Sequence, residues 1–345
     1  MKPKVLLINE GVLQHYRVSL FNSLTEDVDL CVAHIGDKVS GTEFNQITYG
    51  IVNIGPFSYY SIDGLNEYDY VIFPFNLRNL NLYLELFKIR NYKKILFGIG
   101  VNASYRKGYD AKDLISVLRI LFVKKYDYSI FYEKYPILKY ISWGVSPKKM
   151  SVAYNTVTPN KKFNIEDKTY ESIIFIGSLY KQKKIFDLIE AYSILIKNDT
   201  NFLNLEIIGD GQEFNNLRNY IEEKGLQNHV KLHGNIITDD HLLPIMQRAA
   251  VCVSPGQAGL SVQKSFSYGV GFITTQEAIT GGEILSIQEG VTGDFYDGSI
   301  NDLVRTLKKY CDINYCKSIS INSYFFYNKF RSVRNWREGF LRNIK

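Results

Sequence analysis

The sequence has no long apolar run and no cluster of metal ligands. No window is long enough and apolar enough to span a bilayer, and Met1 to Lys4 lead into a strand rather than a signal peptide. The four cysteines are scattered, and Cys31 and Cys252 lie in apolar runs, which indicates buried thiols in a reducing cytoplasm. The five histidines do not group with cysteines at zinc spacing, so no metal site is expected.

Neither sign of charge dominates the chain, and 46% hydrophobic with 22% charged residues is typical of a soluble globular protein. The length of 345 residues suits two domains. The net charge of +6 comes from the first half: residues 1–165 have 21 Lys and Arg against 14 Asp and Glu, and the remainder 20 against 21. This charge indicates either a solvated surface or attraction to anionic lipid headgroups. Basic residues do not cluster with aromatic ones in a recognisable module, so no nucleic-acid partner is expected.

Strands and helices alternate in both halves, which predicts two parallel sheets with helices on both faces. In the first half, strands are predicted at 4–9, 28–33, 70–73, 94–97 and 128–131, with helices at 16–24, 79–89, 111–124 and 134–141. In the second half, strands are predicted at 172–177, 205–209, 230–232, 251–254 and 271–275, with helices at 186–196, 213–224, 241–248 and 260–268. Between the halves, periodicity is lost after Asn155, and Pro159 follows, which predicts a hinge.

The stretch from Val251 to Gly298 carries the most specific pattern. A buried strand at 251–254 runs into Pro255-Gly256-Gln257-Ala258-Gly259, which neither strand nor helix can continue. A helix follows and stops at Gly269, and a second strand begins at Gly271. A strand, a glycine turn and a helix N-terminus point several backbone N–H groups at one place, where an anion fits.

This spacing resembles the retaining GT-B glycosyltransferases of family 4. Gly259-Leu260 and Gly269 match the family signature without a gap, and its two glutamates fall on Gly256 and Lys264. The later Gly281-Gly282-Glu283 and Gly290 to Gly293 resemble the block that follows in the family. The resemblance implies an α/β protein of the GT-B fold, with two Rossmann-like domains facing a central cleft and a C-terminal helix that crosses back to the first domain. It implies a nucleotide-sugar donor linked to UDP or GDP as co-substrate, and no cofactor.

One basic residue is assigned to the donor diphosphate through the same resemblance. The loop Gly177 to Lys184 is similar to the family loop whose arginine and lysine hold the diphosphate. Lys183 matches the lysine and is the predicted catalytic cation, while Ser178 stands at the arginine position. A cation placed there lowers the barrier because the leaving group gains negative charge. The alternative is a solvated lysine run before a helix.

The other predicted donor-binding residues lie in the turns at further strand ends. Gly209-Asp210-Gly211 matches a family turn beside the nucleotide, and Gly234 lies where the base is bound through backbone groups. The segment Gly256-Gln257-Ala258-Gly259-Leu260-Ser261 offers backbone N–H groups to the sugar and the β-phosphate. Lys264 either bonds the ribose or a phosphate, or is an exposed helix residue.

The first half supplies the predicted acceptor side. Glu10 to Arg17 resembles the glycine-containing loop of bacterial polysaccharide glycosyltransferases, which faces the acceptor and the donor phosphates. His15 and Arg17 are predicted catalytic residues, with a capping or surface role as the alternative. Gly11 is predicted to contact the donor. The acceptor-side residues are predicted to be His15, Tyr16, Arg17, Asn76, Arg78 and Asn102.

Three domains follow from these patterns: an acceptor-side domain at 1–157, a nucleotide-sugar-binding domain at 158–320 and an amphipathic crossing helix at 321–345. The helix is predicted from Tyr324 to Asn343, and residues 329–345 contain six basic residues and one acid. Phe330 and Trp336 are interpreted as an apolar anchor to an anionic membrane. The predicted location is the cytoplasm, with peripheral association at the inner face of the plasma membrane. The alternative is that Trp336 and Phe340 lock the helix onto the first domain.

The predicted activity is retaining transfer of a sugar to a lipid-linked glycan acceptor, in O-antigen or capsule biosynthesis. No Ser/His/Asp set and no carboxylate pair is present, and a front-face transfer, in which the departing phosphate helps to deprotonate the acceptor, needs neither. A catalytically degenerate homologue that binds nucleotide-sugar or a partner transferase is the alternative. A nucleotide-sugar epimerase would need carboxylates and a histidine that the sequence does not offer.

Overall fold

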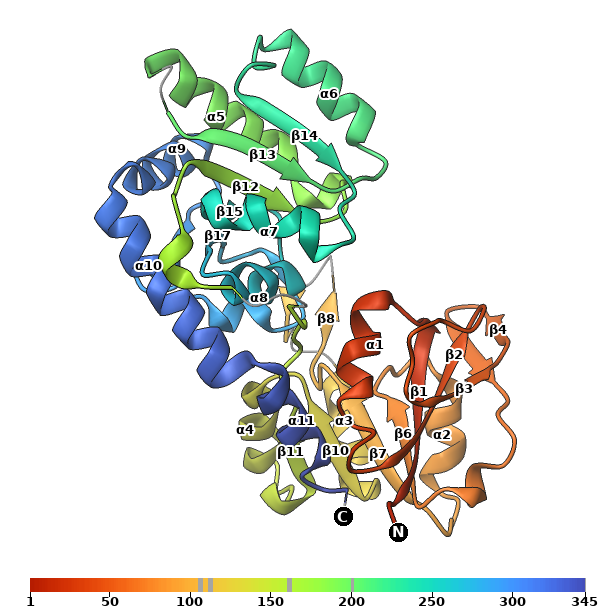
Figure 1. Cartoon of the computed structure of the whole chain (residues 1–345). Helices are drawn as coiled ribbons and strands as arrows, with labels where there is room; N and C mark the ends of the chain where they lie inside the picture. The colour runs from red at the N-terminus through yellow and green to blue at the C-terminus, as the bar shows by residue number, and fades with distance from the viewer. Residues whose placement is uncertain (105–107, 111–113, 160–162, 200–201, 345) are drawn as a thin grey trace. The chain divides into compact units, whose positions relative to one another are not determined.

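The computed structural model describes residues 1–104, 108–110, 114–159, 163–199 and 202–344. The chain forms two compact units (Figure 1). The first comprises Met1–Ala103, Tyr109–Thr158 and Val333–Lys345, and the second comprises Ser104–Gly108 and Pro159–Ser332. The chain therefore passes to the second unit one residue after the predicted boundary at 157, and returns to the first at 333 rather than 321.

A parallel seven-stranded sheet forms the centre of the first unit, in the order β11-β10-β7-β6-β1-β2-β3. Its strands are rich in Val, Ile, Leu and Phe because helices cover both faces. The strands are β1 (Lys4–Val12), β2 (Asp29–Ile35), β3 (Asn45–Thr48), β6 (Tyr70–Pro74), β7 (Lys93–Gly98), β10 (Tyr128–Phe131) and β11 (Met150–Val152). Short strands outside this sheet are β4 (Ile51–Ile54), β5 (Phe57–Tyr60), β8 (Ala103–Ser104) and β9 (Gly108–Tyr109).

Two layers of helices enclose that sheet. One core contains Leu82, Phe122 and Tyr140 from α2 (Leu80–Leu86), α3 (Leu114–Lys125) and α4 (Lys134–Ser142). The core on the opposite face contains Phe21 from α1 (His15–Asn22) and both Trp336 and Phe340 from α11 (Val333–Leu341). Helix α11 approaches β11 closely, because a Cβ on Gly339 would lie 1.7 Å from Val152 O.

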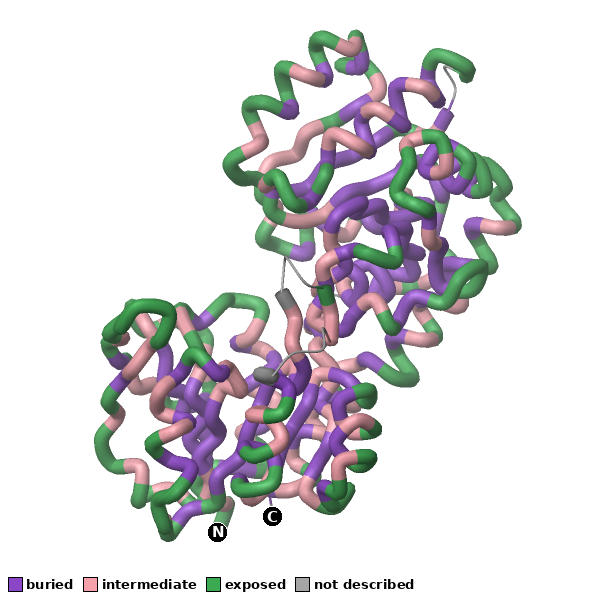
Figure 2. Tube along the Cα trace, turned by 180° about the vertical axis from the view of Figure 1, so that it is seen from behind, coloured by how far each residue is buried: buried purple, intermediate pink, exposed green. Residues whose placement is uncertain are grey.

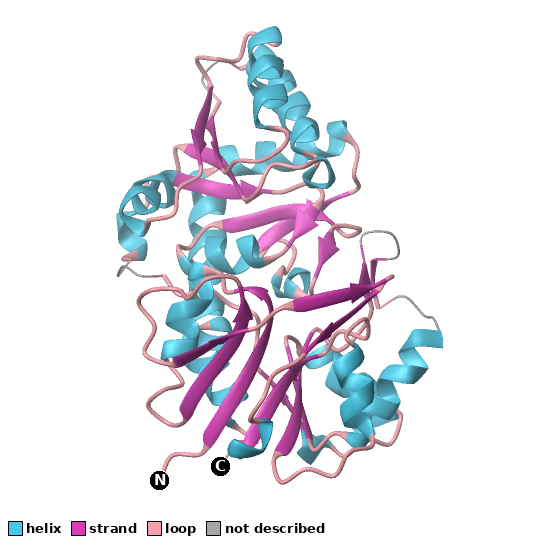
Figure 3. Ribbon diagram, turned by 90° about the vertical axis from the view of Figure 1, so that its right-hand side faces the viewer, coloured by secondary structure: helices cyan, strands magenta, loops and turns pink. Residues whose placement is uncertain are grey.

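The second unit is built around a parallel six-stranded sheet in the order β14-β13-β12-β15-β17-β19. Its strands are β12 (Ser172–Ile176), β13 (Asn204–Ile208), β14 (Val230–Gly234), β15 (Ala249–Val253), β17 (Gly271–Thr275) and β19 (Gly293–Tyr296). Figure 3 shows strands and helices layered in this way, and Figure 2 shows buried segments in the interior and exposed segments toward the outside. The short strands β16 (Gln257–Ala258) and β18 (Ile279–Thr280) pair outside this sheet.

Helices cover both faces of the second sheet. The core on one face contains residues of α5 (Ile185–Asn198), α6 (Phe214–Glu223), α9 (Ile300–Lys308) and α10 (Ile313–Phe326). The core on the other face contains residues of α7 (Asp239–Arg248) and α8 (Leu260–Ser267). This order, with the strand sequence reversing beside β12, is that of a Rossmann-like unit, and it brings the ends of β12 and β15 together.

The predicted continuous C-terminal helix is wrong. A π-helical turn at Tyr327–Arg331 follows α10, and Ser332 is extended, with φ −63° and ψ 161°, before α11 begins. Trp336 and Phe340 are completely buried in the first unit, so Trp336 is not the membrane anchor that the sequence suggested and both residues hold α11 in place. Within the described ranges, no helix is both long enough and apolar enough to cross a membrane.

Candidate functional site

Three loops meet at the carboxyl ends of β12, β13 and β15. Glycine residues allow the backbones of these loops to pack directly against one another. A Cβ on Gly209 would lie 1.9 Å from Gly177 O, and one on Gly211 would lie 2.4 Å from Leu179 O. A Cβ on Gly256 would lie 1.9 Å from Gln182 O. No side chain fits at these contacts. Gly209, Gly211 and Gly256, three of the predicted donor-binding glycines, therefore shape a single backbone surface.

Lys183 lies at the centre of these loops and is 7% exposed. It ends the 3-10 turn Lys181–Lys183, and its Nζ lies 3.2 Å from the place that a Cβ on Gly177 would take. Among the described residues, none accepts a hydrogen bond from Lys183 Nζ or pairs with it. Its neighbour Cys252 supplies no counter-charge, because burial raises the pKa of that thiol to about 11. Its Nζ lies over the ring of Tyr180, 5.7 Å from the centroid. A largely buried ammonium with an aromatic contact but no anionic partner is suited to an incoming anion.

Burial also lowers the pKa of Lys183 to about 8. The cause is desolvation, which disfavours the charged form of a buried lysine. A bound diphosphate would favour the charged form and raise the pKa again. Anion binding at this loop is therefore expected to be coupled to the protonation of Lys183.

A cavity of about 430 Å³ opens beside the Lys183 loop, lined by Ser178, Leu179, Tyr180, Gln182, Gly211 and Gln212. Two predicted donor residues, Ser178 and Gly211, lie in its wall. Tyr180 OH donates to Gln257 Oε1, which ties this loop to the turn before α8. The cavity wall thus comes from two segments, which follow the parallel strands β12 and β13.

The structure shows which groups of the glycine turn before α8 are already used. Gly256 N–H donates to Lys183 O at 3.1 Å, and Gly256 O accepts from Ile279 N–H at 3.0 Å. Gln257 and Ala258 form β16. At the start of α8 Gly259 has an open Cβ position, and Ser261 Oγ is buried with no hydrogen-bond partner in the described part of the chain. The end of this turn, rather than Gly256, therefore offers groups to a ligand.

Lys264, at the second signature position, forms an ion pair. Its Nζ donates to Asp239 Oδ1 at 2.8 Å, and the side chains are 19% and 5% exposed. Asp239 begins α7, where a carboxylate is also favoured by the helix dipole. The pair joins α7 to α8, so Lys264 is not the freely exposed helix residue that the sequence left as one alternative.

Replacing Lys264 by alanine is expected to lower the free energy of unfolding by about 3 kcal/mol, because the buried Asp239 carboxylate would lose the cation that balances its charge. Urea unfolding measures this effect. Asp239→Ala and the double variant complete a double-mutant cycle. Additive losses in the double variant would contradict a coupled pair.

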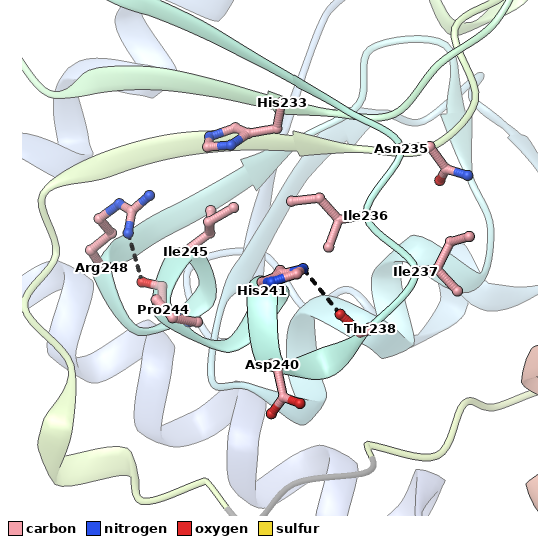
Figure 4. A pocket seen from close by; sticks show the side chains of 10 residues that line it. All are labelled: His233, Asn235, Ile236, Ile237, Thr238, Asp240, His241, Pro244, Ile245 and Arg248. Atoms are coloured by element: carbon pink, nitrogen blue, oxygen red, sulfur yellow. Dashed lines mark hydrogen bonds between the residues drawn. The ribbon is translucent and has the colours of Figure 1, made fainter.

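Gly234 ends β14, and the residues on either side of it, His233 and Asn235, line a second cavity of about 630 Å³ (Figure 4). Gly234 adopts φ +68° and its carbonyl accepts from Gly209 N–H at 2.8 Å. In the cavity wall, His233 Nε2 lies 2.8 Å from Glu206 Oε2. Arg248 binds both oxygens of that carboxylate. Burial raises the pKa of Glu206, but hydrogen bonds from Arg248 and His233 outweigh it and hold the pKa below its ordinary value. The His233 side chain is therefore structural.

In the first unit, Arg17 is the best-built candidate. Its guanidinium lies over the rings of Tyr16 and Tyr132, at 5.6 and 5.9 Å from their centroids. Nη2 donates to Asn155 Oδ1 at 3.1 Å, while Nη1 is buried and no described residue accepts from it. A permanently charged guanidinium with one unused buried nitrogen can receive a phosphate or sugar oxygen.

The remaining first-unit candidates lie at the carboxyl ends of β1, β6 and β7. His15 and Tyr16 are exposed at the start of α1, and Gly11 adopts φ +101°. Asn76 Nδ2 donates to Glu10 Oε1 at 2.6 Å. Partial burial raises the pKa of Glu10, against the opposing effects of Asn76 and Arg78. The exposed Arg78 and the half-buried Asn102 follow β6 and β7.

Five residues around these sites were not predicted from the sequence: Glu10, Tyr132, Asn155, Tyr180 and Asp239. Glu10 and Tyr180 stand inside motifs that were singled out, so their proximity to the candidates was the available signal. Tyr132 and Asn155 follow β10 and β11, and their contact with Arg17 needs the strand order of the sheet. Among the described residues, no group of three or more His, Cys, Asp or Glu is placed to hold a metal ion.

Residues 157–323 match the model of the family described as glycosyl transferases, group 1. That part of the chain belongs to the group 1 glycosyltransferases. The match falls almost entirely on the second unit, which holds Lys183 and the glycine loops. No curated protein sequence matches the chain.

Solved structures resemble this chain over nearly its whole length. HepE from Anabaena in complex with UDP has 13% identity and a TM-score of 0.71, with 100% of this chain and 99% of that chain covered. A glycosyltransferase from Rickettsia africae has 13% identity and a TM-score of 0.71, over 99% and 97%. The lipopolysaccharide outer core galactosyltransferase WaaB has 16% identity and a TM-score of 0.63, over 99% and 100%. At these identities the likeness shows the fold.

The predicted GT-B fold, group 1 family and transferase class are confirmed by these matches. Assignment to family 4 within the group, and to a bacterial polysaccharide type, stays a prediction. The roles of the individual site residues also stay predictions.

Proposed function

We propose that the protein is a retaining glycosyltransferase that moves a sugar from a UDP- or GDP-linked donor to a lipid-linked glycan in O-antigen or capsule biosynthesis. HepE has been solved with UDP and with UDP-glucose, which supports a nucleotide-sugar donor for this fold. WaaB is a lipopolysaccharide galactosyltransferase, and a TarM variant has been solved with UDP and the glycan fondaparinux. These relatives support a glycan acceptor. Neither a metal nor an organic cofactor is required by the proposal.

The observation that carries the proposal is the buried ammonium of Lys183, which has no anionic partner among the described residues and lies among three glycine loops. In the proposed step, the bond between the sugar C1 and the diphosphate oxygen breaks, and the acceptor hydroxyl oxygen bonds to C1 on the same face. The hydroxyl proton passes to the departing phosphate. Lys183 stabilises the charge that grows on the leaving diphosphate. The free N–H groups at the start of α8 assist it.

Arg17 and His15 are proposed to orient the acceptor and the reacting phosphates from the first unit. Arg17 retains one buried nitrogen without a partner, which gives it the means to bind an oxygen. The acceptor is proposed to be membrane-bound, so the enzyme would work at the cytoplasmic face of the plasma membrane as a peripheral protein.

A panel of UDP- and GDP-linked sugars tests the donor. Thermal shift measures binding, and release of the nucleotide measures turnover. The anomeric configuration of a product, determined by NMR, tests retention. If none of the donors in the panel were bound or turned over, the proposal would be contradicted.

Activity is expected to survive EDTA. A diphosphate can be neutralised by Lys183 and backbone N–H groups, and no metal-ligand cluster lies among the described residues. Turnover is compared with and without the chelator, and after addition of Mg²⁺ or Mn²⁺. Strict dependence on either ion would contradict this account of the leaving group.

A second candidate function is a catalytically degenerate homologue that binds nucleotide-sugar or a partner transferase. The position of the first signature glutamate is Gly256, whose contact with Gln182 O leaves no room for any side chain. The second is Lys264, which is engaged with Asp239. Donor binding without turnover or hydrolysis, for every acceptor fraction tried, would favour this function.

A further inference from the structure

The outer sides of three helices in the first unit expose large apolar residues. Inward, α2, α3 and α4 bury Leu82, Phe122 and Tyr140 in the core. Outward, the three helices and the turn after α2 expose Leu84, Phe87, Val117, Leu121, Leu138 and Ile141. Phe87 is 78% exposed and Val117 is 62% exposed. These outward side chains and the lysines beside them are called the α2–α4 face.

On α3 the exposed residues follow the helical repeat. Val117, Leu121 and Lys124 are spaced four and three residues apart, so they form one stripe along the helix. The opposite side of α3 is buried by Phe122 and Val123. A surface helix ordinarily turns polar residues to water, and a contiguous exposed apolar patch marks an interaction site.

The exposed charged side chains of the three helices are all basic, and Asp110, which lies against α4, is paired with Lys139. Helices α3 and α4 contain no acidic residue. The single acid of α2, Glu85, is 5% exposed and is held by Arg90 and by Tyr92 OH at 2.9 Å. Lys124, Lys125 and Lys134 are exposed, and no described acid forms an ion pair with them. The face therefore combines apolar side chains with uncompensated positive charge.

We propose that the α2–α4 face docks the protein on an anionic lipid surface. Apolar side chains would enter the boundary between headgroups and acyl chains, and the lysines would meet anionic headgroups. A second copy of the chain fits less well, because a symmetric contact would bring the lysines of both copies together. The proposal gives a place to the membrane association in the proposed function, but its test uses no donor or acceptor and can fail independently.

The location differs from the one that the sequence suggested. Within the first unit, α11 covers the opposite face of the sheet from α2, α3 and α4. Two arginines of α11 already have acidic partners: Arg334 binds Glu338, and Arg337 binds Asp27. Helix α11 therefore provides a matched control.

Vesicle flotation of the full chain tests the docking. Protein should float with vesicles of phosphatidylcholine mixed with phosphatidylglycerol, less with phosphatidylcholine alone, and less as salt is added. The triple variant Lys124→Gln/Lys125→Gln/Lys134→Gln should partition on the order of a hundredfold more weakly, since each basic residue near the surface contributes about fivefold. Leu121→Ser/Leu138→Ser should also lose binding, and lower salt should not restore it.

Two control variants keep the test specific. Val52→Ser/Ile54→Ser changes exposed apolar residues of β4 in the same unit, and Arg334→Gln changes α11. Both should float like the unaltered protein, and circular dichroism should show every variant folded. Loss of flotation with Arg334→Gln alone would overturn the proposal. So would a dimer in ultracentrifugation that Leu121→Ser/Leu138→Ser dissociates, or no flotation of the unaltered protein at low salt.

Discussion

Replacing Lys183 by alanine is expected to lower turnover about a hundredfold or more while leaving the protein folded. The ammonium is preorganised beside the place where the leaving diphosphate gains charge, and one such group commonly contributes that much. Its removal also takes away a desolvated charge, so stability should not fall. The measurement is nucleotide release under single-turnover conditions. Lys181→Ala, in the same turn but exposed, is the matched control and should retain activity.

The pH dependence checks the same assignment. In the free protein the pKa of Lys183 is lowered to about 8, and a bound diphosphate raises it. Donor affinity should therefore be highest below pH 8 and fall as the pH rises above it, because binding then requires a proton to be taken up. Lys183→Arg, which stays charged, should flatten this dependence. Normal turnover of the alanine variant would remove Lys183 from the mechanism.

Restoring the first signature glutamate, by Gly256→Glu, is expected to destroy the site rather than to improve it. The Cβ alone would lie 1.9 Å from Gln182 O, so the loop that holds Lys183 must move. Gly256→Ala should therefore destabilise the protein by about 3 kcal/mol, at the upper end for inserting one group into a packed interior. Urea unfolding measures the loss, and thermal shift with UDP measures donor binding.

Gly259→Ala is the matched control for this change. Gly259 has φ −116°, and a Cβ there would approach only Gln257 Nε2, at 3.7 Å. It should lower stability by less than about 1 kcal/mol. If Gly256→Ala were as stable as Gly259→Ala, the close packing of the two loops would be contradicted.

Much of the fold was predictable because buried parallel strands are short apolar runs. The strand predicted at 128–131 is β10 itself, and the prediction of 94–97 differs from β7 by one residue at each end. The helix predicted at 111–124 is described from Leu114 to Lys125, and its first three residues lie outside the described part. Strands β3, β4 and β5 were missed because Asn, Thr and Ser interrupt their apolar residues. The break at Ser332 was missed because the aromatic residues on both sides keep helical spacing.

The candidate site also has features that the sequence predicts and features that only the fold reveals. Lys183 and the glycines of the second unit stand in contiguous motifs, so local spacing was enough to single them out. The partner of Lys264 lies 25 residues away on another helix, and only the packing of α7 on α8 shows that it is Asp239. The sequence around Gly256 likewise does not show why glycine is required there, because the contact is with Gln182, in the loop after a different strand.

The position of α11 has a consequence for biosynthesis. Trp336 and Phe340 fill the core of the first unit, and Gly339 lies against the backbone of β11. During translation, residues 1–158 leave the ribosome long before these side chains exist. The first unit therefore cannot complete its core until the last residues have emerged, whereas the second unit, closed at Ser332, can do so earlier. Synthesis from the N-terminus ordinarily favours the first domain, and here the order of completion is reversed.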